Sequence, residues 1–100
     1  MWEVKLTVKA EEELRKNVQF GKINGEDINI IKAWINQIEK YGPKYIQSER
    51  KWDDHKLHGL WEGFRSSCFS GSGRIIYKII EKRILVEVVR VTPDHNYGSF

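Results

Sequence analysis

The sequence has 100 residues, of which 40% are hydrophobic and 31% charged, and its formal net charge is +3. This length and balance fit one globular domain over residues 1–100 and exclude two separate cores or a disordered chain. No apolar run reaches the roughly 18 residues of a membrane span, and the first residues do not resemble a signal peptide, so we expect a cytoplasmic protein with no membrane partner.

The start of the chain predicts one strand and then one short helix. Residues 2–9 alternate apolar and polar side chains, which is typical of a half-buried strand. In residues 10–18 the apolar side chains recur every four positions, with acids early and bases later, which predicts a helix. The pair Asn24-Gly25 ends this pattern.

A second helix is predicted in the middle of the chain. Asp27 is a suitable N-cap, and the isoleucines of residues 28–38 follow helical spacing. The pair Gly42-Pro43 is a typical helix stop. Residues 44–58 are polar and densely charged without a period, so we expect an ordered loop there.

The last part of the chain predicts three strands, over residues 60–69, 74–80 and 84–91. Turns at 70–73 and 81–83 join them into an antiparallel meander. The predicted fold class is therefore α+β in the order β-α-α-β-β-β. We expect a small twisted, mainly antiparallel sheet with two helices packed on one face and the other face partly open.

Positive charge is concentrated in the predicted sheet, which favours an anionic partner. Residues 65–83 contain five cationic side chains and one acid. The cations are Arg65, Arg74, Lys78, Lys82 and Arg83, and the acid is Glu81. For Lys82 and Arg83 the plainer interpretation is a solvated strand edge.

The single cysteine, Cys68, cannot form an internal disulfide, and no Cys/His spacing resembles a zinc site. We expect no metal and no cofactor. No partner histidine is fixed by spacing, so Cys68 is interpreted as a small buried residue and not as a nucleophile.

Three short motifs resemble the RelE/ParE superfamily of bacterial toxins. A leucine, a glycine and a tryptophan lie within residues 57–61, Arg74-Ile75-Ile76-Tyr77 begins the next strand, and His95 with Tyr97 follows the last strand. The order and length of the predicted elements are also similar to that superfamily, nearest its RelE, YoeB and YafQ branches. Asn96 separates His95 from Tyr97, where the YoeB-like branch has the two side by side.

The chain departs from the individual branches at the second predicted strand. Cys68 and Ser72 stand where the YafQ-like branch carries a histidine and an acid, and Arg65 is followed by serines where RelE has lysines. The motifs therefore resemble the superfamily more closely than any one branch.

The resemblance implies the toxin of a type II toxin-antitoxin system, with a cognate antitoxin as its partner. In the nearest branches such a toxin is a metal-independent endoribonuclease that cleaves messenger RNA on the ribosome and inhibits translation. One alternative is a ParE-like toxin that inhibits DNA gyrase without cleaving anything, although the His95-Asn96-Tyr97 ending favours the nuclease. Another is a catalytically silent module that binds RNA or a partner, since one fold serves many functions.

Metal-free RNA cleavage requires a base for the 2′-hydroxyl, a cation for the phosphate and an acid for the departing 5′-oxygen. Arg74 is the first candidate for the phosphate, with Arg65 and Arg90 next, because a guanidinium stays charged and can bind two oxygens. His95 is the candidate acid, and Tyr97 is a further candidate catalytic residue. The candidates for the base are His55, His58 and Glu49.

The predicted RNA contacts combine cations with aromatic rings suited to stacking on a base. They are Lys56, Trp61, Lys78, Arg90 and Phe100, and Tyr97 is also suited to stacking. Two of these contacts have a plainer alternative: Trp61 suits core packing, as Tyr77 does, and Arg90 suits a cross-strand pair with Glu87 or Glu62. His55 and His58 also suit ordinary loop positions.

Overall fold

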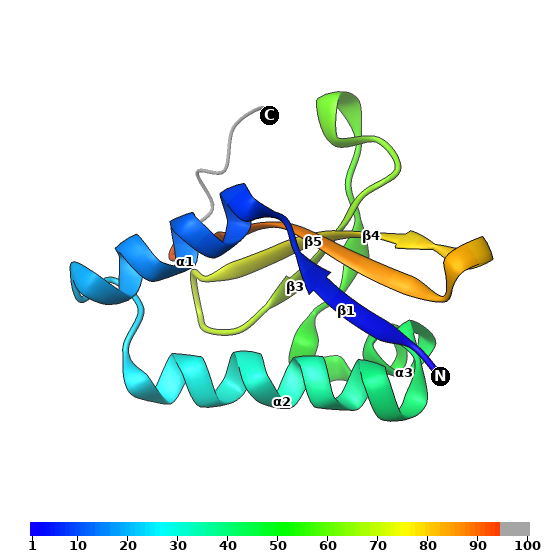
Figure 1. The fold of residues 1–100 in the computed structure, drawn as a ribbon, viewed down its shortest axis with the longest axis horizontal. Coiled ribbons are helices and arrows are strands. Elements are labelled where there is room, and N and C mark those ends of the chain that lie inside the picture. The colour runs from blue at the N-terminus through cyan, green and yellow to red at the C-terminus, as the bar shows by residue number, and fades with distance from the viewer. Residues whose placement is uncertain (95–100) are drawn as a thin grey trace.

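The computed structural model describes residues 1–94, which fold around a sheet with the strand order β1-β5-β4-β3-β2 (Figure 1). The strands are β1 (Glu3–Leu6), β2 (His55–Lys56), β3 (Arg65–Cys68), β4 (Arg74–Ile80) and β5 (Leu85–Thr92). The helices are α1 (Val8–Gln19), α2 (Gly25–Tyr41) and α3 (Pro43–Ser48). β1 pairs parallel with β5 and the other neighbours pair antiparallel, so the predicted α+β class and the β3-β4-β5 meander are confirmed.

The first strand is shorter than predicted because Thr7 begins a helix. The Thr7 hydroxyl accepts a hydrogen bond from the amide of Ala10 at 3.1 Å, which satisfies one of the open donors at the start of α1. Val8 is therefore the first residue of α1 and is 74% exposed. Its place in the alternating pattern of residues 2–9 predicted a strand wrongly.

The N-cap of α2 lies three residues before the predicted one. The Asn24 side chain accepts from the Asp27 amide at 2.8 Å, and the Asp27 carboxylate accepts from the Asn24 amide at 3.1 Å. This reciprocal capping box makes Asn24 the N-cap, so the prediction of Asp27 as the cap was wrong. The predicted stop is confirmed: α2 ends at Tyr41 and Gly42 is its C-cap, with a φ of 87° in the region that favours glycine.

Residues 44–58 do not form the loop that was predicted. Pro43 occupies the first turn of α3, where its missing N–H costs nothing. A short 3₁₀ turn, Arg50–Trp52, and the strand β2 follow. Ile46 and Trp52 are buried in the core, so packing and not a local periodic pattern orders this segment. A second 3₁₀ turn, Gly59–Trp61, also delays the next strand from residue 60 to Arg65.

Two apolar clusters cover the two faces of the sheet. The main core lies between one face and all three helices. It includes Ala10, Ile31, Trp34, Ile38, Ile46, Ile75, Tyr77, Val86, Val88 and Val91. On the other face, Leu57 and Trp61 from the segment between β2 and β3 pack on Ile76 of β4. That segment stands out on the side opposite α2 (Figure 1). No helix within residues 1–94 is long and apolar enough to span a bilayer.

Candidate functional site

Arg74 is held at the start of β4 by the tight turn that precedes it. One guanidinium nitrogen, Nη1, donates to the carbonyl oxygens of Gly73 at 2.9 Å and Gly71 at 3.4 Å, and the residue is 8% exposed. A Cβ at Gly73 would lie 2.4 Å from the Phe69 ring, so the turn closes this tightly only with glycine. The sequence prediction of a cation at a glycine-rich turn therefore corresponds to a fixed, largely buried arginine.

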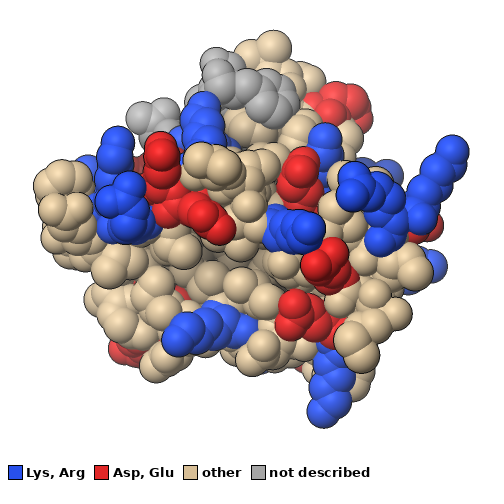
Figure 2. All heavy atoms as spheres, viewed as in Figure 1, with Lys and Arg blue, Asp and Glu red and all other residues tan. Residues whose placement is uncertain are grey.

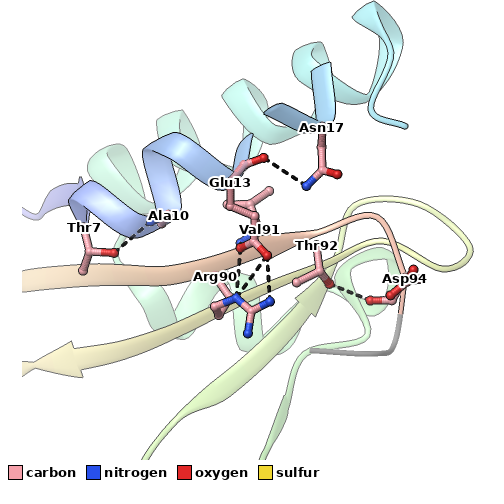
Figure 3. Close-up of polar contacts among 8 residues, drawn as sticks. All are labelled: Thr7, Ala10, Glu13, Asn17, Arg90, Val91, Thr92 and Asp94. Carbon is pink, nitrogen blue, oxygen red and sulfur yellow. Dashed lines mark hydrogen bonds and ion pairs between the residues drawn. The ribbon is translucent and has the colours of Figure 1, made fainter. Parts of the chain in front are cut away.

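The end of β5 lies beside this turn. Thr92 is the strand partner of Arg74, and the Ser72 hydroxyl donates to the carbonyl of Pro93 at 2.8 Å. The Thr92 hydroxyl donates to the carbonyl of Asp94 at 2.5 Å (Figure 3). The chain thus leaves the sheet next to Arg74. The predicted site residues that follow, His95, Tyr97 and Phe100, lie outside the described residues.

A buried carboxylate organises the β2 edge of the sheet. Asp54, whose side chain is fully buried, accepts from Arg65 Nε at 2.6 Å, from Ser67 Oγ at 2.6 Å and from the Tyr77 hydroxyl. Burial lowers the pKa of Arg65, but the hydrogen bond and charge of Asp54 outweigh it and raise the pKa overall. Burial and then the Asp54 charge raise the pKa of Tyr77 far above its usual range.

Arg65 is therefore part of a structural ion pair. Its side chain is 18% exposed and has the carboxylate of Asp54 as its partner.

The strand pairing places His55 and Arg74 on the same face of the sheet. His55 lies opposite Ser66, and Ser66 lies opposite Ile76, two residues after Arg74. Directly paired residues, and alternate residues along a strand, project to the same side. From the strand spacing and rise, the Cα atoms of His55 and Arg74 are about 12 Å apart.

The His55 ring has a fixed orientation. Its Nδ1 lies 2.9 Å from the carbonyl oxygen of Asp53, which can only accept a hydrogen bond, so Nδ1 carries the proton. In the neutral ring Nε2 is then the basic nitrogen. The other two candidate bases lie elsewhere: Glu49 caps the end of α3 and accepts from the Tyr45 hydroxyl at 3.4 Å, and His58 precedes the Gly59–Trp61 turn.

Arg90 has a partner that was not predicted. Its guanidinium forms a bidentate ion pair with Glu13 of α1, with the shortest contact at 2.7 Å between Nη2 and Oε2. The predicted pairing with Glu87 or Glu62 was therefore wrong. Glu87 pairs with Lys78 at 3.6 Å instead.

The remaining predicted RNA contacts are divided between surface and interior. Lys56 is exposed on β2, whereas Trp61 is 5% exposed and packs edge-on against Phe64 with ring centroids 5.2 Å apart. Trp61 thus has the packing role and not that of an open stacking platform. The ammonium of Lys78 lies 5.7 Å from the Phe64 ring centroid as well as close to Glu87. On the face shown in Figure 2, basic and acidic side chains are interspersed and form no single basic patch.

Cys68 lies at a hollow of about 300 Å³ between α2 and β3, which Ile30, Ala33 and Trp52 also line. Burial raises the pKa of its thiol, the Arg74 charge opposes the rise, and Asp53 at 3.8 Å adds to it. A thiol with a raised pKa is a poor nucleophile at neutral pH. Among residues 1–94, no group of three or more His, Cys, Asp or Glu side chains is placed to hold a metal ion.

Comparison of the whole fold with solved structures gives clear matches, although no protein-family model and no curated protein sequence matches the chain. YafQ from E. coli superposes with a TM-score of 0.77 at 17% identity, over 98% of this chain and 100% of that chain. A metal-bound toxin from Helicobacter pylori gives 0.74 at 21% identity, over 95% and 96%. The YoeB-YefM complex from Staphylococcus aureus gives 0.68 at 15% identity, over 97% and 99%.

The chain has the fold of the RelE-family toxins.

Two residues that organise this RelE-type fold were missed by the sequence analysis. Asp54 belongs to a dense run of charges without a period, so nothing in the pattern separates it from solvated neighbours. Glu13 lies in an acidic run that is typical of a helix start, and its partner Arg90 is 77 residues away in sequence. Neither position gives a local signal of its contacts.

Proposed function

We propose that the protein is the toxin of a type II toxin-antitoxin system and that it cleaves messenger RNA on the ribosome, in the cytoplasm, without a metal ion. The observation that carries this proposal is the fixed Arg74, which lies at the end of a RelE-type sheet beside the point where the chain leaves β5. The fold supports it as well, since YafQ and YoeB share this fold and form toxin-antitoxin complexes with DinJ and YefM.

Arg74 is assigned to the scissile phosphate. Charge accumulates on the non-bridging oxygens as the 2′-oxygen attacks, and a guanidinium already held in place stabilises that charge without reorganising. Burial in the turn strengthens this interaction because little water screens it. Arg74 therefore contributes mainly to the transition state.

The two proton transfers are assigned to histidines. His55 Nε2 removes the proton of the 2′-hydroxyl, the 2′-oxygen bonds to phosphorus, and the bond to the 5′-oxygen breaks. His95, which follows Asp94 in the chain, donates the proton that the 5′-oxygen needs. The products are a 2′,3′-cyclic phosphate and a 5′-hydroxyl.

A cognate antitoxin is the proposed protein partner. Acidic side chains placed near Arg74 compete with RNA for the same charge, so one segment laid across this face blocks the site. The affinity of the antitoxin is expected to fall as salt concentration rises. An affinity that is the same at low and high salt contradicts a charge-mediated block.

The decisive experiment is a translation reaction in vitro, followed by primer extension on the message. The proposal expects new cleavage ends within the translated message and no effect on gyrase supercoiling in a parallel assay. Inhibited supercoiling with an intact message indicates a ParE-like toxin. If the message stays intact and gyrase stays active, the chain is a silent binding module and the nuclease proposal is wrong.

A further inference from the structure

β5 continues beyond the strand that pairs with its outer edge. β1 covers β5 from Leu85 to Val88, and the last contact is the Thr7 amide donating to the Val88 carbonyl at 2.9 Å. The chain then enters α1, while β5 runs on to Thr92 with a bulge at Val89. The amides on this part of the edge therefore need acceptors other than a strand.

Glu13 of α1 supplies such an acceptor. Its Oε1 accepts from the Val91 amide at 2.9 Å, while the same carboxylate binds Arg90 through Nε at 3.0 and 3.1 Å and through Nη2 at 2.7 Å (Figure 3). The side chains of Arg90 and Glu13 are 15% and 18% exposed. A bidentate, largely buried pair of this kind fixes both orientation and distance.

The contact between Glu13 and Val91 is connected to Arg74 by the pairing of β5 with β4. Val91, which Glu13 holds, pairs with Ile75, and the next residue, Thr92, pairs with Arg74. Ser72 holds the following residue, Pro93, from the other side. The end of β5 is thus fixed between α1 and the turn that carries Arg74.

We propose that Glu13 is a positioning residue for Arg74. It touches no reacting atom in this assignment. At the end of β5, Glu13 supplies the hydrogen-bond acceptor that a neighbouring strand would otherwise supply. The position of this end of β5 then fixes Arg74 through the pairing of β5 with β4. This inference rests on the proposed function, because Arg74 is taken there as the phosphate ligand.

The test is a double-mutant cycle measured by single-turnover cleavage of a ribosome-bound message with the protein in excess. The variants are Glu13→Gln, Arg74→Ala and the two combined, with Glu12→Gln as the matched control. Glu12 is the neighbouring exposed acid on α1, whereas a glutamine at 13 loses the charge and places an amide donor against Arg90. Measuring the cleavage rate over a range of protein concentrations gives the maximal rate and the protein concentration at half-saturation separately.

We expect Glu13→Gln to lower the maximal rate about tenfold with little change in half-saturation, and the double variant to be no slower than Arg74→Ala alone. Glu12→Gln should match the unmodified protein. Losses that add in the double variant would show that Glu13 acts on general stability and overturn the proposal. Tighter half-saturation in Glu13→Gln would do so too, because Glu13 would then be withholding Arg90 from RNA.

A second measurement tests the link without using cleavage. The Nε–H signal of Arg74 in ¹⁵N NMR spectra should shift in Glu13→Gln but not in Glu12→Gln, and an unchanged signal overturns the proposal. Glu13→Asp, which keeps the charge but shortens the side chain, serves if the glutamine variant does not fold. If the unmodified protein leaves the message intact, the proposed function fails, and the NMR shift alone then decides whether Glu13 positions Arg74.

Discussion

Replacing Asp54 with asparagine should destabilise the fold strongly, because one buried carboxylate accepts hydrogen bonds from three side chains. Breaking a buried ion pair by removing one partner costs roughly 3–5 kcal/mol. In Asp54→Asn the amide oxygen still accepts one bond, and Arg65, whose side chain is 18% exposed, recovers some hydration. We therefore expect a loss of about 2–3 kcal/mol in the free energy of unfolding.

Urea denaturation at neutral pH measures this loss, and Asp53→Asn is the matched control. Asp53 is exposed and has φ 44° and ψ 45°, a left-handed conformation that asparagine tolerates well. Asp54→Asn should lower the urea midpoint by roughly 1–2 M, and Asp53→Asn should leave it nearly unchanged. Combining Asp54→Asn with Arg65→Met should cost less than the sum of the two single changes, since no unpaired charge then remains. Equal midpoints for the two asparagine variants would refute the view that Asp54 holds this edge of the sheet.

Three further outcomes follow from the site. Because the pKa of Tyr77 is raised above 10.0, the unfolded chain loses this proton at a lower pH than the folded chain does, so the free energy of unfolding should fall as pH rises above 10.0. The fall should be the same in the unmodified protein and in Tyr41→Phe, and smaller in Tyr77→Phe. An equal dependence of stability on pH in all three proteins would contradict the buried Tyr77 hydroxyl. The raised pKa of Cys68 predicts slower alkylation by iodoacetamide at neutral pH than that of glutathione, and a faster reaction would show an activated thiolate. His95→Gln should reduce single-turnover cleavage about 10²-fold with little change in RNA binding, and products that end in a 3′-hydroxyl instead of a cyclic phosphate would contradict the 2′-hydroxyl mechanism.

The elements that the sequence predicts well are those whose pattern is local and sustained. β4 runs from Arg74 to Ile80 as predicted, because a glycine-rich turn precedes a continuous apolar run. β2 has only two residues, and its place depends on side chains of β3 and β4 that bind Asp54. No periodicity can reveal such a strand. Val8 continued the alternation of the first strand, but the hydroxyl of Thr7 determined the local structure.

The site follows the same division. The local setting of Arg74 could be predicted from the sequence because the residues that hold its side chain, Gly71 and Gly73, are its near neighbours. The ion pairs of Arg65 and Arg90 join segments that are distant in sequence, so both arginines resembled candidate phosphate ligands. Only the folded arrangement shows that Arg65 and Arg90 already have carboxylate partners, Asp54 and Glu13.

The central claim is that Arg74 stabilises charge on the scissile phosphate, and the most direct measurement is message cleavage by Arg74→Ala in the translation reaction. Arg83→Ala is the control, since Arg83 lies exposed in the turn between β4 and β5. With folding verified by circular dichroism, Arg74→Ala should cleave about 10²–10³-fold more slowly than the unmodified protein, and Arg83→Ala should cleave at the same rate. A folded Arg74→Ala protein that cleaves the message at the unmodified rate would contradict the assignment.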